Sequence, residues 1–243
     1  MLMADCYQAL EPWLCTPFDR ANRAYLETHL ELLASPVYQF LELLSGENKD
    51  DPQHEQHLRT CLQLLHDARM RGGTLVAVRE AYVNLFGGLL LDPPVWLLER
   101  ERLVRDLSRF NCSGRMVASG KMQLKDAIEQ AEQDQRVAPE IVAELQYRLG
   151  NLFALDSHEG GLYGSETAIV YYEAALQVYQ AERYPLQYAK TLSALGVVYG
   201  RNTKTARLER QVDNLLKALH CYEAALQVWK PQGDGKEQAE EPR

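Results

Sequence analysis

The chain has 243 residues, 46% of them hydrophobic and 25% charged, with a formal net charge of −8. This is the composition of a folded globular protein, and a chain of this length buries roughly 70% of its unfolded surface, so it needs no disulfide or metal ion to fold. The acidic balance disfavours nucleic acid as the main partner.

The cysteines and the N-terminal segment indicate a compartment. The five cysteines are odd in number, widely scattered and without a CxxC pair, which is typical of free thiols in a reducing environment. The first residues lack the basic region of a signal peptide. No run approaches the ~18 apolar residues that a membrane span requires. We therefore expect a soluble, cytoplasmic protein with no membrane insertion.

Apolar residues recur at three- and four-residue steps along most of the chain, which predicts helices. The helices of the first half are expected over residues 18–33, 37–44, 54–71, 74–91 and 95–107. Gly72-Gly73 should end one of them, and Thr74 is placed to cap the next. No strand-type alternation occurs, so the sequence predicts an all-α fold that begins with an N-terminal helical bundle over residues 1–112.

An internal repeat follows. The heptapeptide YEAALQV occurs at 172–178 and again at 222–228, an offset of 50. Upstream, LQYRLGNLF at 145–153 aligns with TLSALGVVY at 191–199, an offset of 46. Each match places one helix ahead of its partner, so a two-helix unit is repeated. The difference of four residues is expected in the connection between the two helices of each unit. We predict that these connections are long loops, over 156–167 in the first unit and 201–213 in the second.

These residues resemble the tetratricopeptide (TPR) repeat family, in the form with long loops between the repeat helices that occurs in bacterial multi-repeat proteins. The matching positions are Leu149-Gly150, Phe153, Ala168, Tyr172 and Ala175, their counterparts Leu195-Gly196, Tyr199, Ala218, Tyr222 and Ala225, and the punctuating Pro139, Pro185 and Pro231. Residues 57–99 are similar to the helical region that precedes the repeats in some of those proteins. The resemblance implies a short α-solenoid of TPR-like helix pairs over residues 119–230.

In this family the outward positions of the first helices bind a protein or peptide. Carried over by the motif alignment, the binding positions are Glu144, Tyr147, Asn151, Lys190, Ser193, Val197 and Arg201. Asn151 and Lys190 match positions where some members hold the C-terminal carboxylate of a peptide, whereas Tyr147 stands where those members have a lysine.

Basic residues gather next to these positions. Between 183 and 217, seven lysines and arginines stand against two acidic residues, a local net charge of +5. Lys204 and Arg207 lie in the predicted loop that follows Arg201 and are included among the partner-binding candidates. One interpretation is a solvated loop that balances the acidic remainder, and the other is a docking surface for an acidic partner.

Catalytic and metal-binding patterns are weak. His54, His57 and Cys61 share one helix at i, i+3 and i+7, but zinc sites normally draw ligands from two elements. Cys221 and His220 are helix neighbours and point about 100° apart. No HExxH, Walker A or GxSxG motif occurs. The sequence predicts no enzyme activity and no cofactor.

The sequence therefore favours a protein–protein interaction scaffold or adaptor that binds a protein or peptide of acidic character. The alternative is a regulatory subunit, or the remnant of a larger multi-repeat signalling protein, with a nucleotide- or enzyme-linked N-terminal bundle. The last predicted helix, 215–230, has an apolar face and no visible cap after it, which would suit a homo-oligomer. Residues 231–243 are polar apart from Ala239, which predicts a disordered tail.

Overall fold

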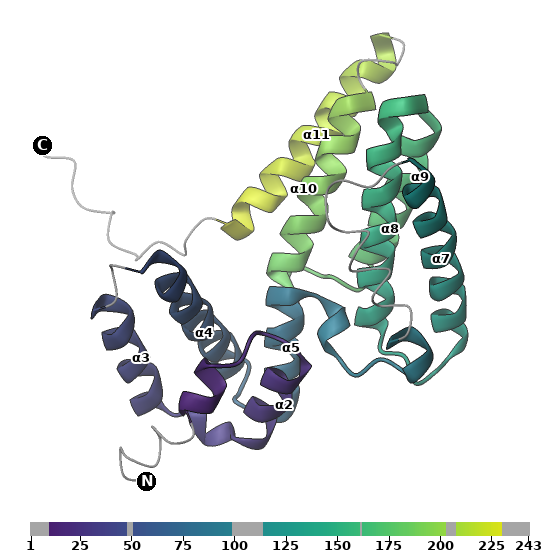
Figure 1. Cartoon of the computed structure of the whole chain (residues 1–243). Helices are drawn as coiled ribbons and strands as arrows, with labels where there is room; N and C mark the ends of the chain where they lie inside the picture. The colour runs from purple at the N-terminus through teal and green to yellow at the C-terminus, as the bar shows by residue number, and fades with distance from the viewer. Residues whose placement is uncertain (1–9, 48–50, 99–113, 161, 203–207, 230–243) are drawn as a thin grey trace, which may run out of the picture. The chain divides into compact units, whose positions relative to one another are not determined.

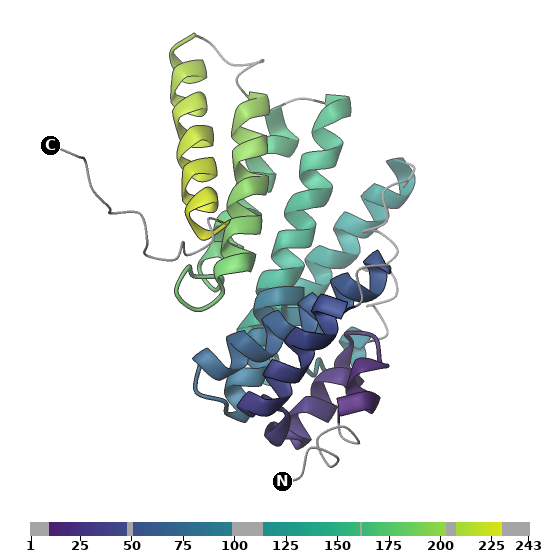
Figure 2. The ribbon, with the colours of Figure 1, turned by 90° about the vertical axis from the view of Figure 1, so that its left-hand side faces the viewer.

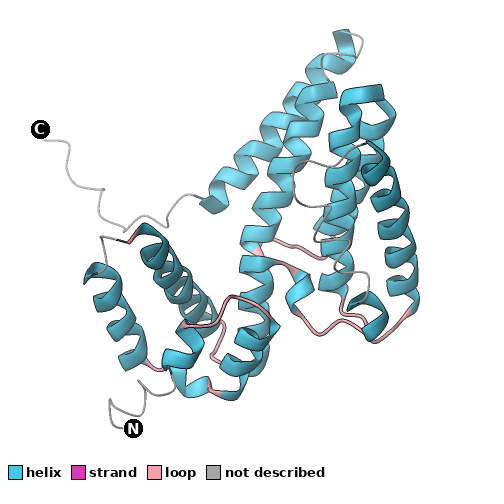
Figure 3. Cartoon of the chain, viewed as in Figure 1, coloured by secondary structure: helices cyan, strands magenta, loops and turns pink. Residues whose placement is uncertain are grey.

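Helices make up the regular structure of this protein, as a computed structural model shows (Figures 1 and 3). The structure describes residues 10–47, 51–98, 114–160, 162–202 and 208–229. Within these ranges there is no strand, so the predicted all-α fold is confirmed. None of the helices described there is both long and apolar enough to span a membrane.

The chain divides into two compact units. The N-terminal unit comprises residues 1–98 together with 134–144, and the C-terminal unit comprises 99–133 together with 145–243. The helices in chain order are α2 (Arg20–Thr28), η1 (Leu30–Leu33), α3 (Ser35–Glu47), α4 (Pro52–Met70), α5 (Leu75–Phe86), η2 (Gly88–Leu90), α7 (Gly114–Gln133), α8 (Pro139–Gly160), α9 (Leu162–Leu176), α10 (Pro185–Asn202) and α11 (Leu208–Trp229). One division between the units falls inside α8.

Side-chain caps define where the helices of the N-terminal unit begin. The Asp19 carboxylate accepts a hydrogen bond from the backbone N–H of Asn22 at the start of α2, and the Asp51 carboxylate accepts from two N–H groups of α4. The Thr74 hydroxyl accepts from the N–H of Ala77, as the sequence predicts. These caps satisfy N–H groups that have no partner within the helix.

The core of the N-terminal unit is apolar with one buried polar network. Leu26, Leu41, Leu58 and Leu65 are fully buried within a larger cluster of aliphatic and aromatic side chains. The polar network joins Trp13, Asn22 and Tyr82. The Trp13 indole N–H donates to the Tyr82 hydroxyl (3.2 Å), and the Tyr82 hydroxyl donates to the Asn22 side-chain oxygen. The Asn22 amide donates in turn to the Trp13 carbonyl (2.8 Å). Each polar group in this triangle has a partner, which is the condition for burying it at low cost.

The residues 134–144 complete the N-terminal unit by packing on Gly87-Gly88. A Cβ atom added to Gly88 would lie 1.9 Å from the Glu140 carbonyl oxygen, and one added to Gly87 would lie 2.3 Å from a carboxylate oxygen of Glu144. Only glycine allows the start of α8 to approach this closely. This second Gly-Gly pair therefore ends α5 and also forms a contact surface.

In the C-terminal unit, consecutive helices run in opposite directions (Figures 1 and 2). Two predicted loops are wrong. Residues 156–167 are mostly helical, because α8 continues to Gly160 and α9 begins at Leu162, and α11 begins at Leu208 rather than near 215. The predicted helix over 18–33 is also divided, because α2 ends at Thr28 and a 3₁₀ turn follows. The predicted tail and the region around 111–113 lie outside the described residues.

Candidate functional site

In each of the two repeated helix pairs, the first helix packs against the second through a glycine that contacts a tyrosine. A Cβ atom added to Gly150 of α8 would lie 2.7 Å from Cε1 of Tyr172 on α9, and one added to Gly196 of α10 would lie 2.9 Å from Cε1 of Tyr222 on α11. These contacts join the residues that the offsets of 46 and 50 align. The sequence repeat therefore has a counterpart in helix packing.

The other aligned positions are packing positions as well. Leu149, Ala168 and Ala175 are fully buried in the first pair, and Leu195, Ala218 and Ala225 are buried in the second. Small residues here let the paired helices approach each other, and the tyrosines fill the space beside the glycines.

Two contacts show how the first helices of the two pairs lie. The Lys190 ammonium lies 4.8 Å from the centroid of the Tyr147 ring, and the Arg201 guanidinium donates to the Ala154 carbonyl (3.2 Å). Both contacts join α10 to α8, and residue numbers rise together along the two helices. The segment 147–154 of α8 and the segment 190–201 of α10 therefore lie side by side and run in the same direction. We call the surface that carries Tyr147, Asn151, Lys190, Val197 and Arg201 the first-helix surface.

A tyrosine from the second helix fixes the polar centre of this surface. The Tyr172 hydroxyl donates to the Asn151 side-chain oxygen (2.8 Å), and the Tyr172 ring packs at 5.9 Å from the Tyr147 ring. Burial raises the pKa of the Tyr172 phenol above its ordinary value, so the phenol keeps its proton and remains a donor. With its oxygen held in this way, the Asn151 side chain is oriented with its NH₂ group as the remaining donor.

The predicted binding residues of α10, together with Tyr147 and Asn151 of α8, differ in how far they are exposed. Lys190, Val197 and Arg201 are exposed, with 40% exposure for Val197, while Tyr147 and Asn151 are half-buried. The Ser193 hydroxyl donates to the Ala189 carbonyl of its own helix (2.8 Å), which satisfies it locally. The structure therefore brings together Tyr147, Asn151, Lys190, Val197 and Arg201.

Ser193 is thus left out of this group, and Glu144 does not join it either. Glu144 is only 2% exposed and belongs to the N-terminal unit, where it packs on Gly87. The prediction that Glu144 contacts a partner is corrected, because a carboxylate buried there has no surface to offer. Lys204 and Arg207 lie outside the described residues.

Other charged residues of the basic cluster are already engaged. The Lys217 ammonium forms an ion pair with Asp213 (3.0 Å) and lies 5.7 Å from the Tyr199 ring centroid. The Arg183 guanidinium lies over the Tyr184 ring at 5.1 Å. Among the basic residues that the structure describes, Lys190 and Arg201 are the ones assigned to the first-helix surface.

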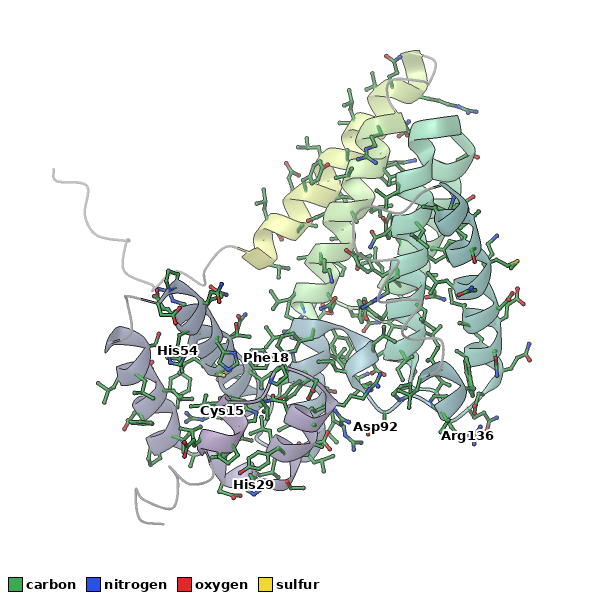
Figure 4. All side chains as sticks on the ribbon, in the orientation of Figure 1. Cys15, Phe18, His29, His54, Asp92 and Arg136 are labelled. Carbon is green, nitrogen blue, oxygen red and sulfur yellow. The ribbon has the colours of Figure 1, made fainter. Side chains whose placement is uncertain are left out.

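The histidine and cysteine residues of α4 are separated in their environments. His54 lies near the start of the helix and is exposed (Figure 4). The His57 ring stacks on Phe18 at 4.7 Å and its Nε2 atom lies 2.9 Å from the Leu14 carbonyl oxygen. Cys61 is fully buried, and burial raises its pKa to about 12. Across the part of the chain that the structure describes, no group of three or more His, Cys, Asp or Glu residues could hold a metal ion.

The sequence did not indicate two features of the C-terminal unit. Tyr172 was identified as a packing residue, and its hydroxyl contact with Asn151 depends on their positions across two helices. The apolar face of the last helix extends further than predicted, because α11 starts earlier. Its exposed residues are Val212, Leu215, Leu216, Leu219, Tyr222 and Leu226. The three- and four-residue spacing of these side chains was the signal that could have identified them.

Comparison of the chain with protein-family models, with curated proteins and with solved structures gives no match.

Proposed function

We propose that this protein is an interaction scaffold or adaptor of TPR-like architecture, and that it binds an extended acidic peptide segment across the first-helix surface. The observation that supports this most is the Lys190 ammonium held 4.8 Å from the Tyr147 ring centroid on an accessible face. A cation placed on an aromatic ring keeps its charge and gains orientation. A carboxylate from a partner then has a fixed position at which to pair.

The geometry of α10 defines what the segment should look like. Lys190, Val197 and Arg201 are separated by seven and four residues and so share one helix face. At 1.5 Å of rise per residue, Lys190 and Arg201 are ~16 Å apart along the helix. An extended peptide covers that distance in about five residues at ~3.3 Å each. We therefore expect two acidic groups about five residues apart, one of which can be a C-terminal carboxylate.

Between the two cations the surface offers apolar and amide contacts. Val197 is 40% exposed, and the Tyr147 ring is half-buried. Asn151 presents its NH₂ group, because its oxygen accepts from Tyr172. Such a donor fits a backbone carbonyl of the bound segment. Apolar contact gives affinity, while the charges give register and a faster association that salt weakens.

The cysteines support a reducing compartment for this function. Cys15, Cys61 and Cys221 are free thiols, and the last two are buried. A reducing cytoplasm keeps such thiols unpaired. We propose the cytoplasm as the place where the scaffold acts.

The test uses fluorescently labelled peptides in which two glutamates are separated by two, five or eight residues, each made with a free and an amidated C-terminus. Binding is followed by fluorescence anisotropy at two salt concentrations. We expect the five-residue spacing to bind most tightly and to weaken with salt. The comparison of free and amidated ends tells whether one cation receives the terminal carboxylate.

The matching variant is Lys190→Ala with Arg201→Ala. Because one exposed ion pair contributes about 0.2–1 kcal/mol, the double variant should weaken binding by about two- to thirty-fold. The control is Arg59→Ala with Arg136→Ala, which removes the same charge from side chains that are 65% and 80% exposed in the N-terminal unit. Equal affinity of the two double variants would show that the first-helix surface is not the binding site.

A further inference from the structure

The last helix of the repeat has an apolar outer face. Its members are Val212, Leu215, Leu216, Leu219, Tyr222 and Leu226, and their exposed fractions run from 37% for Tyr222 to 60% for Leu216. Apart from the adjacent Leu215 and Leu216, they recur every three or four residues over four turns of α11, so they form one continuous stripe. Within the described residues no helix covers this stripe. An apolar surface of this length on a protein is typical of an interaction site.

The internal repeat shows what this face lacks. Tyr172 of α9 and Tyr222 of α11 are equivalent, and each packs on the glycine of its first helix. Tyr172 is 1% exposed, whereas Tyr222 is 37% exposed. The difference follows from the neighbours, because α9 packs against the next first helix, α10, and α11 is the last helix that the structure describes. The outer face of α11 therefore has room for one more antiparallel helix.

We propose that the missing neighbour is α11 of a second copy of this chain, packed antiparallel about a two-fold axis at Leu219. The stripe is nearly symmetrical about this residue. Leu216 and Tyr222 lie three residues to either side, and Val212 and Leu226 lie seven residues to either side. In a two-fold antiparallel pair each residue faces its mirror position, so five of the six stripe residues meet an apolar side chain, and Leu215 is the exception.

The direction and the charges of α11 agree with this arrangement. A two-fold axis perpendicular to the helix makes the second α11 run antiparallel, which is the direction that α10 has relative to α9. Leu215 faces Glu223 of the second copy, and Lys217 lies within a helical turn of the same residue. Since α11 carries both signs of charge, pairing with itself does not oppose like charges along the stripe.

Residues after α11 are unsuited to cover the stripe. The sequence from 231 to 243 contains one apolar residue, Ala239, so it cannot bury six large side chains. A second copy supplies an apolar side chain opposite every stripe residue except Leu215. The second copy also has the same net charge of −8, so the two chains repel at long range and salt should tighten the dimer. This is opposite to the salt effect expected for an acidic peptide on the first-helix surface.

The first experiment measures molar mass by size-exclusion chromatography with light scattering. We expect the full chain to show twice its 27.7 kDa, and Leu219→Asp to return it to a single chain, because the charge is placed at the axis in both copies. The matched control is Val170→Asp on α9, where the side chain is 61% exposed, and it should stay dimeric. Circular dichroism must show both variants folded. A wild-type chain that runs as a monomer at every concentration tested, or a dimeric Leu219→Asp, would overturn the proposal.

The second experiment tests the register by disulfide cross-linking between introduced cysteines. The background chain carries serine at Cys6, Cys15 and Cys112. In this chain, Leu219→Cys should cross-link with itself under mild oxidation. Val212→Cys alone should not cross-link, but it should when mixed with Leu226→Cys. Self-cross-linking of Val212→Cys would show a parallel pair, and equal cross-linking of Val170→Cys would show random collision, and either result excludes the proposed interface.

Discussion

Three glycines on α8 and α10 allow the helix packing to be tested quantitatively with one kind of substitution. In Gly150→Ala the new Cβ would lie 2.7 Å from a carbon of Tyr172, about 1 Å closer than the optimal separation of two carbon atoms. The ring cannot easily retreat, because it is 1% exposed and its hydroxyl is bonded to Asn151. Overpacking of this kind costs about 1–3 kcal/mol, while replacing a helical glycine by alanine contributes about 0.5–1 kcal/mol.

The net expectation for Gly150→Ala is therefore a loss of about 0–2.5 kcal/mol in the free energy of unfolding. Gly200→Ala is the matched control, because nothing lies within 4 Å of its new Cβ, and it should gain about 0.5–1 kcal/mol. Gly196→Ala should fall between the two, since Tyr222 is 37% exposed and can move outward.

Urea unfolding followed by far-ultraviolet circular dichroism measures all three variants against the wild type. For a chain of this size, 1 kcal/mol corresponds to about 2–4 °C in Tm, so a thermal scan gives an independent reading. The effect of Gly150→Ala should also shrink in a Tyr172→Leu background, where the ring is absent. If Gly150→Ala stabilises the protein as much as Gly200→Ala does, the glycine–tyrosine contact is not tight and the aligned packing of the two pairs is wrong.

Further predictions concern the two cores. Tyr82→Phe should lower the free energy of unfolding by about 1–3 kcal/mol, measured in urea, because the Trp13 indole N–H and the Asn22 oxygen both lose their partner. Ala175→Leu should cost about 1–3 kcal/mol by the same assay, since Ala175 is fully buried. A thiol reagent should modify the exposed Cys15 in the folded protein and Cys61 only after unfolding. Because burial raises the Cys61 pKa from 9.0 to about 12, the folded state holds this proton more tightly. Its contribution to stability is thus complete below pH 9 and lost as the pH rises toward about 12, and Cys61→Val should lack this part of the pH dependence in urea titrations.

The repeat could be predicted from the sequence because its packing leaves little choice of residue. A glycine opposite a tyrosine, with alanines along the same face, is required wherever two helices approach this closely, and so the same letters recur. The positions of Gly150 and Gly196 against their tyrosines follow from this constraint alone. The helical structure of these segments could be predicted for the same reason, because the packing residues recur at helical spacing.

The connections were mispredicted because local composition does not decide them. Residues 156–167 contain three glycines and several polar residues, which favour a loop by propensity, yet all the positions described there, 156–160 and 162–167, are helical. The charged residues just before 213 suggested a solvated loop in the same way, although an exposed helical turn tolerates them equally. Packing against neighbouring helices outweighs propensities of a few tenths of a kcal/mol.

The Glu144 prediction was wrong for a different reason. Transfer by alignment assumes that two copies of a repeat have the same surroundings, and Lys190, the counterpart of Glu144, is indeed exposed. The start of α8, however, packs on Gly87 and Gly88 in the N-terminal unit. A contact with residues so far away in the sequence leaves no trace in the repeat itself.

The contribution of residues 134–144 to the N-terminal unit has a consequence for synthesis of the protein. A ribosome adds about 5–20 residues per second, so residue 98 precedes the start of α8 by some seconds. During that interval the surface of Gly87-Gly88, which Glu140 and Glu144 later cover, is open, and Asp134 is not yet present to accept from the Trp96 indole. A nascent chain that stops near residue 112 should therefore be more sensitive to protease than one that extends past 144. Truncation at the predicted boundary, residue 112, would remove residues 134–144, which belong to the N-terminal unit.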